Sequence, residues 1–153
     1  MKKSLLFLTL IMFLTTNLKA QIEELPPNKS TLVGKVGGGL GPFIASLEYD
    51  KGDEDQNKYV LSYNNLKYTT ITSINRLKFT ATEEVLNKFY EALKNCFSAE
   101  KGSEKQFKLG TELVNITTTK NLGISSIYVY TTDMGTVGYF LLTEKQLNKL
   151  FGK

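Results

Sequence analysis

Two segments of this chain, 61 residues apart, start with the same pattern, and each follows a series of short alternating segments. Thr82-Glu83 precedes Leu86-Asn87-Lys88-Phe89, and Thr143-Glu144 precedes Leu147-Asn148-Lys149-Leu150. Apolar residues three and four positions apart indicate one buried helix face. A constant offset in both letters and element order is typical of a duplicated unit. The sequence therefore predicts an α+β fold: antiparallel sheets with two helices, from duplication of a multi-strand-plus-helix unit.

The strands are predicted from alternation of apolar and polar residues and from turn signals between the alternating segments. In the first half we expect strands at 32–36, 43–49, 59–63, 66–74 and 76–79, and in the second half near 107–109, 114–116, 127–131 and 137–141. The run 37–41 is rich in glycine but lacks the Gly-Lys-Ser/Thr ending of a phosphate loop, so we interpret it as a hairpin connection.

The helices should supply much of the core. In the first, we expect a capping box in which Thr80 is the cap and Glu83 reaches back; in the second, Thr143 and Gln146 take these roles. The predicted core positions share helical spacing on one face: Leu86, Phe89, Tyr90 and Leu93, then Leu147 and Leu150.

If the two halves are copies, each helix should lie on its own strands. Tyr68 and Tyr130, each the first residue of a Tyr-Thr-Thr string, should then occupy equivalent strand positions.

The first twenty residues have the order of a secretory signal peptide. Lys2 and Lys3 precede an apolar run of about ten residues, which is too short for a membrane-spanning helix. We expect cleavage between Ala20 and Gln21 and a periplasmic or extracellular product without a membrane anchor. Residues 21–30 then form an exposed leader, and 31–153 a single domain of two pseudo-repeats, about 31–100 and 104–153.

Composition excludes several classes of function. The sequence has no histidine and one cysteine, Cys96, so Ser-His-Asp catalysis, Cys-His catalysis and a four-cysteine zinc site are excluded. Cys96 falls on the apolar helix face, and we expect it to be buried and structural; the alternative is an intermolecular disulfide in an oxidising compartment. Three of the 19 basic residues lie in the predicted signal peptide, so the net charge of +4 falls to +1 after cleavage. Nucleic acid is therefore not an expected partner.

The acidic loop near residue 53 is the one weak candidate for metal binding. Asp53, Asp55 and Asn57 place oxygen ligands at alternate positions, but Lys58 and Asn64 stand where a calcium loop needs glycine and glutamate. We therefore expect a solvated loop, and no cofactor. The many tyrosines and phenylalanines should mostly be core residues or cross-strand pairs; the alternative is a stacking platform.

The predicted order, several antiparallel strands and then a helix, twice over, resembles that of whirly-type single-stranded DNA-binding proteins and of tandem-repeat secreted inhibitor domains. The resemblance concerns element order alone and does not determine function. Our first hypothesis is an exported, non-catalytic domain that binds an unknown protein or surface ligand. One alternative is a carboxylate-dependent enzyme acting on carbohydrate, and another is a single-stranded nucleic-acid-binding domain of whirly-like topology.

Overall fold

The computed structural model describes residues 30–39, 41–53, 55–133 and 135–153, and the predicted signal peptide and all of the leader except Ser30 lie outside these ranges. Eight strands and two helices follow one another in two series. The first is β1 (Thr31–Gly37), β2 (Phe43–Lys51), β3 (Asn57–Asn64), β4 (Ile74–Ala81) and α2 (Glu83–Cys96); the second is β5 (Glu104–Leu109), β6 (Glu112–Asn121), β7 (Ile124–Asp133), β8 (Thr136–Thr143) and α3 (Glu144–Leu150).

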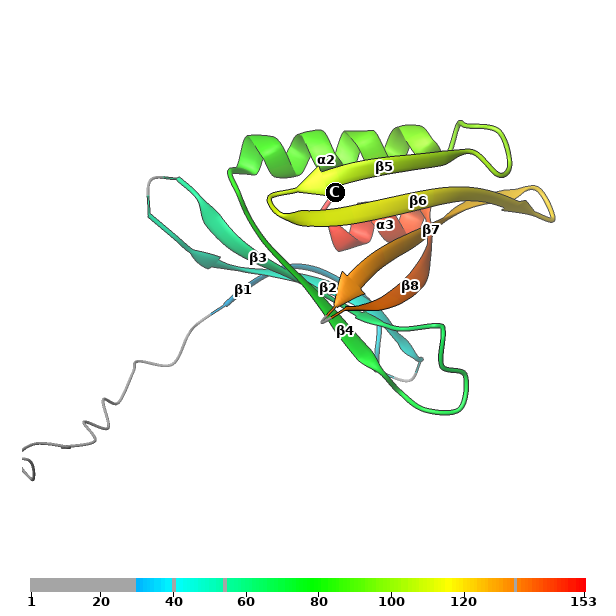
Figure 1. Ribbon diagram of the computed structural model, residues 1–153, viewed down its shortest axis with the longest axis horizontal. Helices are drawn as coiled ribbons and strands as arrows, with labels where there is room; N and C mark the ends of the chain where they lie inside the picture. Colours follow the sequence, from blue (N-terminus) through cyan, green and yellow to red (C-terminus); the bar gives the residue numbers. More distant parts are fainter. Residues whose placement is uncertain (1–29, 40, 54, 134) are drawn as a thin grey trace, which may run out of the picture.

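Each series forms one four-stranded antiparallel sheet with its strands in sequence order (Figure 1). We call β1–β4 the first sheet and β5–β8 the second sheet. Neighbouring strands are joined by hairpins, and the glycine-rich run at 37–41 is one of these connections, with the Gly38 amide donating to the Pro42 carbonyl at 3.1 Å. The predicted α+β fold with a repeated strand-plus-helix unit is confirmed.

The inner faces of the two sheets and both helices enclose one hydrophobic core. Alternate residues of each strand point inward, because successive side chains of a strand lie on opposite faces. All six predicted helix positions are buried, from Leu147 at 0% exposure to Leu86 at 9%. Tyr59, Tyr63 and Phe140 belong to the same core, where Tyr63 and Phe140 stack across the two sheets with ring centroids 4.6 Å apart.

Duplication predicts that each helix lies on the strands of its own unit. In the structure each helix packs on the other sheet instead. α2 packs on the second sheet: the Thr118 hydroxyl of β6 donates to the Cys96 carbonyl at 2.9 Å, and Phe89 meets Phe107 of β5 edge to face. The last turn of α3 lies directly on β1, where a Cβ at Gly34 would approach the Leu150 carbonyl oxygen to 2.6 Å. Non-local packing decides which sheet a helix covers, and the two units are interlocked as a result.

Two local predictions were wrong. The N-cap of α2 is Thr82, whose side chain accepts from the Val85 amide at 3.2 Å, and Thr80 lies within β4. The segment 66–74 is not a strand; residues 65–73 form the loop between β3 and β4, so Tyr68 lies in a loop and Tyr130 in β7. The Tyr-Thr-Thr match is therefore a coincidence of letters, whereas Thr82 and Thr143 are equivalent caps.

Candidate functional site

The outer faces of the two sheets carry different chemistry. On the first sheet the outward positions of β2–β4 include charges of both signs: Glu48, Asp50, Lys58, Arg76 and Lys78. Interspersed opposite charges are the usual composition of a solvated protein surface.

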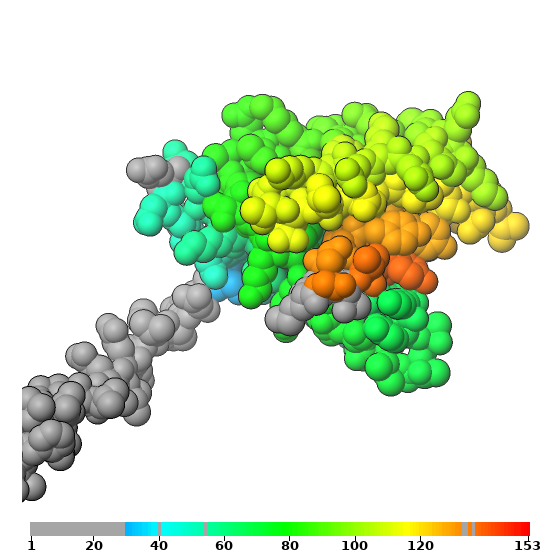
Figure 2. Space-filling model, viewed as in Figure 1, coloured from blue at the N-terminus to red at the C-terminus, as the bar shows by residue number. Residues whose placement is uncertain are grey.

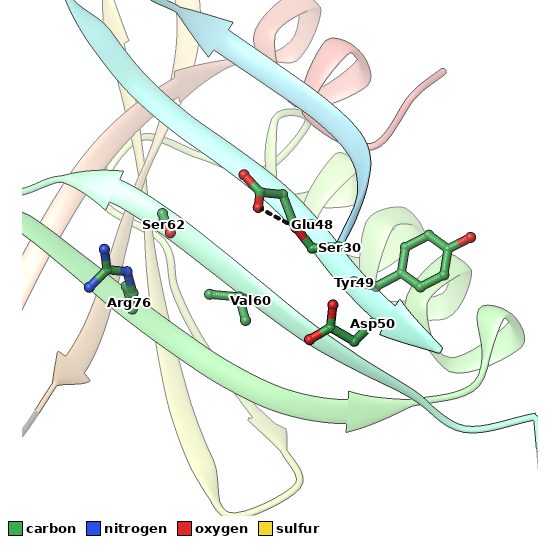
Figure 3. A pocket seen from close by; sticks show the side chains of 7 residues that line it. All are labelled: Ser30, Glu48, Tyr49, Asp50, Val60, Ser62 and Arg76. Atoms are coloured by element: carbon green, nitrogen blue, oxygen red, sulfur yellow. Dashed lines mark hydrogen bonds between the residues drawn. The ribbon is translucent and has the colours of Figure 1, made fainter. Parts of the chain in front are cut away.

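A shallow hollow of about 340 Å³ lies on this charged face (Figure 3). Its lining includes Glu48, Asp50 and Arg76, and Glu48 accepts a hydrogen bond from the Ser30 hydroxyl at 3.2 Å. Figure 3 shows the Val60 side chain between those of Asp50 and Arg76. Two carboxylates, those of Glu48 and Asp50, therefore share this depression.

The outer face of the second sheet is uncharged across β6–β8, in the part of the chain that the structure describes. Its outward residues are Leu113, Asn115, Thr117, Thr119, Ile124, Ser126, Tyr128, Tyr130, Thr132, Val137, Tyr139 and Leu141. We call this set the tyrosine face. In Figure 1 the second sheet lies in front of α3, and Figure 2 shows the same strands at the surface, coloured yellow to orange.

Three tyrosines form a contact cluster at the centre of the tyrosine face. Tyr130 lies opposite Tyr139 in the register of β7 and β8, with ring centroids 5.4 Å apart. Tyr128 meets Tyr139 edge to face at 5.9 Å and Tyr130 at 6.2 Å. Each ring is partly exposed, so an apolar ring surface and a phenolic hydroxyl are offered to solvent together.

Hydrogen-bonding groups border the cluster on the side of β5. A hollow of about 510 Å³ there is lined by Gln106, Asn115, Thr117 and Tyr130, and by the charged Glu104 and Lys105 of β5. The Gln106 amide donates to the Asn115 side-chain oxygen at 2.7 Å. Burial raises the pKa of Tyr130, and the neighbouring Tyr128, Tyr139 and Glu104 add to this, while a hydrogen bond with Thr117 opposes it. Tyr130 is therefore a neutral hydrogen-bonding group at neutral pH.

Large apolar side chains extend the tyrosine face at both ends. Leu113 and Val137 are 48% and 53% exposed at one end, and Ile124 is 59% exposed at the other. Beyond Ile124, Leu122 projects from the tip of the β6–β7 hairpin with a φ of 50°, followed by Gly123 at 80°. Two residues with positive φ form the turn type that usually takes Asn-Gly, so a leucine here is both strained and fully exposed.

The weak metal candidates lie in and beside the connection between β2 and β3. Asp53 and Asp55 lie in the exposed β2–β3 connection, and the Asn57 amide donates to the Tyr59 hydroxyl at 3.4 Å. No group of three acidic or cysteine side chains that could hold a metal ion occurs among the residues described.

Cys96 is buried on α2, where its thiol donates to the Ala92 carbonyl at 3.3 Å. Burial raises the pKa of this thiol, and only a weaker effect of Lys105 lowers it. A thiol in this environment is a poor nucleophile.

The sequence contained a signal for the tyrosine face that alternation alone could not interpret. Alternation in the predicted strand 137–141 puts Val137, Tyr139 and Leu141 on one side, as the structure has them, but a period of two does not say whether that side is buried. The expectation of cross-strand aromatic pairs describes Tyr130 and Tyr139 correctly, although on the solvent side. Comparison with protein-family models, curated proteins and solved structures finds no match to this chain.

In the described part of the chain, no helix has the length and apolar character needed to cross a membrane.

Proposed function

We propose that this chain is an exported, non-catalytic interaction domain that binds a protein partner through its tyrosine face. The observation that supports this most strongly is the contact cluster of Tyr128, Tyr130 and Tyr139 on the solvent side of a sheet, without a charged neighbour on the described outward positions of β6–β8. The cores of protein interfaces are enriched in tyrosine and depleted of charge.

The free energy of binding depends on which groups lose their water when a face is covered. Covering a charged face removes water from ions, which costs free energy unless each ion finds a partner. The tyrosine face offers rings, hydroxyls and amides instead, and tyrosine contributes contact area with little loss of rotamer freedom. The exposed Leu113, Ile124 and Val137 add apolar surface beside the tyrosines, which supports a binding surface.

The carboxylate-enzyme alternative would use the hollow on the first sheet. Glu48 and Asp50 are separated by one residue on β2, so both side chains lie on the same face of the sheet. In an enzyme, E48Q or D50N would abolish hydrolysis of a susceptible polysaccharide, whereas an interaction domain has no hydrolysis to lose. Nucleic-acid binding would need lysines aligned along one face, and the tyrosine face has none at its described outward positions.

Site-specific photocrosslinking in cells that make the protein tests the proposal. A benzophenone amino acid is placed at Thr132 on the tyrosine face or, as the matched control, at Lys78 on the outer face of the first sheet; both positions are exposed. We expect a discrete protein adduct from position 132 and none from position 78. Adducts from position 78 alone, or equal adducts from both, would overturn the proposal.

A further inference from the structure

In the second sheet, two charged residues of the edge strand β5 lie symmetrically about the row that contains Tyr130 and Tyr139. One row across the outer face contains Gln106, Asn115, Tyr130 and Tyr139. On β5, Glu104 lies two residues before Gln106 and Lys108 lies two residues after it, and both are exposed. An acid and a base thus stand at equal distances on either side of the central row.

This arrangement is self-complementary. We propose that the occupant of the tyrosine face is a second copy of this chain, stacked face to face about a two-fold axis that crosses the strands at the row of Tyr130. The inference rests on the proposed function and names the partner of the same surface. Such an axis turns each strand antiparallel to its counterpart. It brings Glu104 of each copy opposite Lys108 of the other, so that two such pairs lie along β5, one on each side of the axis.

The other rows agree with this pairing. The same axis sets Leu141 opposite Val137 of the second copy and brings the two Tyr139 rings together on the axis, at the β8 edge. Neutral side chains therefore meet neutral side chains over β6–β8, and opposite charges meet only along β5, at the rim. An apolar core with a charged rim is the usual anatomy of a protein interface. Long Glu and Lys side chains can span the offset that sheet twist introduces.

The size of the face predicts a weak association. Four strands about 4.8 Å apart and roughly eight residues long, at about 3.3 Å per residue, cover about 500 Å² per copy. Two such faces approach the lower limit of specific interfaces, so we expect a reversible dimer that forms at micromolar concentrations.

Sedimentation equilibrium of the purified chain, from about 1 µM to 1 mM, tests the inference with a charge exchange. In E104K and in K108E, like charges face each other across the axis, so we expect dimerisation to weaken at least tenfold. The double variant E104K/K108E restores opposite charges and should recover wild-type affinity. K78E, on the other sheet, is the matched control and should not change it. All three positions are exposed, and circular dichroism checks that each variant folds.

A chain that stays monomeric to 1 mM would overturn the homodimer. So would a dimer insensitive to the single exchanges, or one that the double exchange fails to restore. These outcomes concern only the identity of the partner: photocrosslinking at position 132 to a different protein would keep the proposed function while removing the second copy as its occupant.

Discussion

The Tyr63 hydroxyl of β3 and the Thr131 hydroxyl of β7 are hydrogen-bonded at 2.9 Å, 68 residues apart in sequence, and join the two sheets inside the core. Both residues are at most 2% exposed. Asn65 extends the link at the edge of β8, where its side-chain oxygen accepts from the Tyr139 amide at 3.2 Å. Residue 139 of β8 therefore takes part in both features. Its backbone amide is bound by Asn65, and its side chain belongs to the tyrosine cluster.

Gly138 is the residue that lets this link form. A Cβ at this position would lie 2.6 Å from the Tyr63 hydroxyl and 2.7 Å from the side-chain amide nitrogens of Asn65 and Asn75. We expect Gly138→Ala to lower the free energy of unfolding by about 1–3 kcal/mol, because buried polar groups must move to admit the methyl group. Urea unfolding measures the change. Gly41→Ala, with nothing within 4 Å, is the control and should be nearly neutral.

The core position of α2 predicts a large truncation effect. Phe89 is 5% exposed and packs against Phe107 and Phe151. Phe89→Ala should cost about 3–5 kcal/mol, as aromatic truncations in cores do. Val85→Ala on the same helix, 44% exposed, should change stability by less than about 1 kcal/mol. Equal effects at the two positions would mean that α2 does not dock on the core.

The thiol of Cys96 should be protected from reagents in the folded state. Its raised pKa leaves less thiolate at pH 8 than a free cysteine has, and the side chain is 1% exposed. We expect reaction with a disulfide reagent to be slow in buffer and fast in concentrated urea. Rapid reaction in both conditions would contradict the burial of this helix face.

The strained hairpin tip predicts a stabilising substitution. Leu122 is fully exposed at a φ of 50°, a conformation that asparagine adopts more readily. Leu122→Asn should therefore raise the free energy of unfolding by up to about 1 kcal/mol. Leu122→Val, which places a β-branched residue at the same positive φ, should lower it. A stability loss in the asparagine variant would show that the leucine makes contacts in the folded protein.

The sequence predicted elements well where the determining interactions are local. Helical spacing located both helices, and the Thr143–Gln146 capping box forms as expected. The first cap was misplaced by two residues because Thr80 and Thr82 offer the same chemistry, and only the length of β4 decides between them. The β-branched residues of 66–74 predict a strand, but this segment instead crosses to the edge of β8, where the Leu66 amide donates to the Tyr139 carbonyl.

The candidate site could be predicted only in part, because it depends on which face of each sheet is covered. Tyr59 and Tyr63 lie inward on β3, whereas Tyr128 and Tyr130 lie outward on β7, with the same alternation in the sequence. Residue spacing also cannot predict which sheet each helix covers, because this depends on long-range contacts such as that of Thr118 with Cys96. The tyrosine face became identifiable only once the buried side was known.

Tyrosine nitration, mapped by mass spectrometry, tests whether a bound partner covers the tyrosine face in the cells that make the protein. The protein is nitrated in producing cells and, separately, after purification and dilution below 1 µM. Tyr68, 39% exposed in the β3–β4 loop, serves as the internal reference. We expect Tyr128, Tyr130 and Tyr139 to be protected in the cells and to react after dilution, while Tyr68 reacts equally in both samples. Equal reactivity of the three tyrosines in both samples would contradict it.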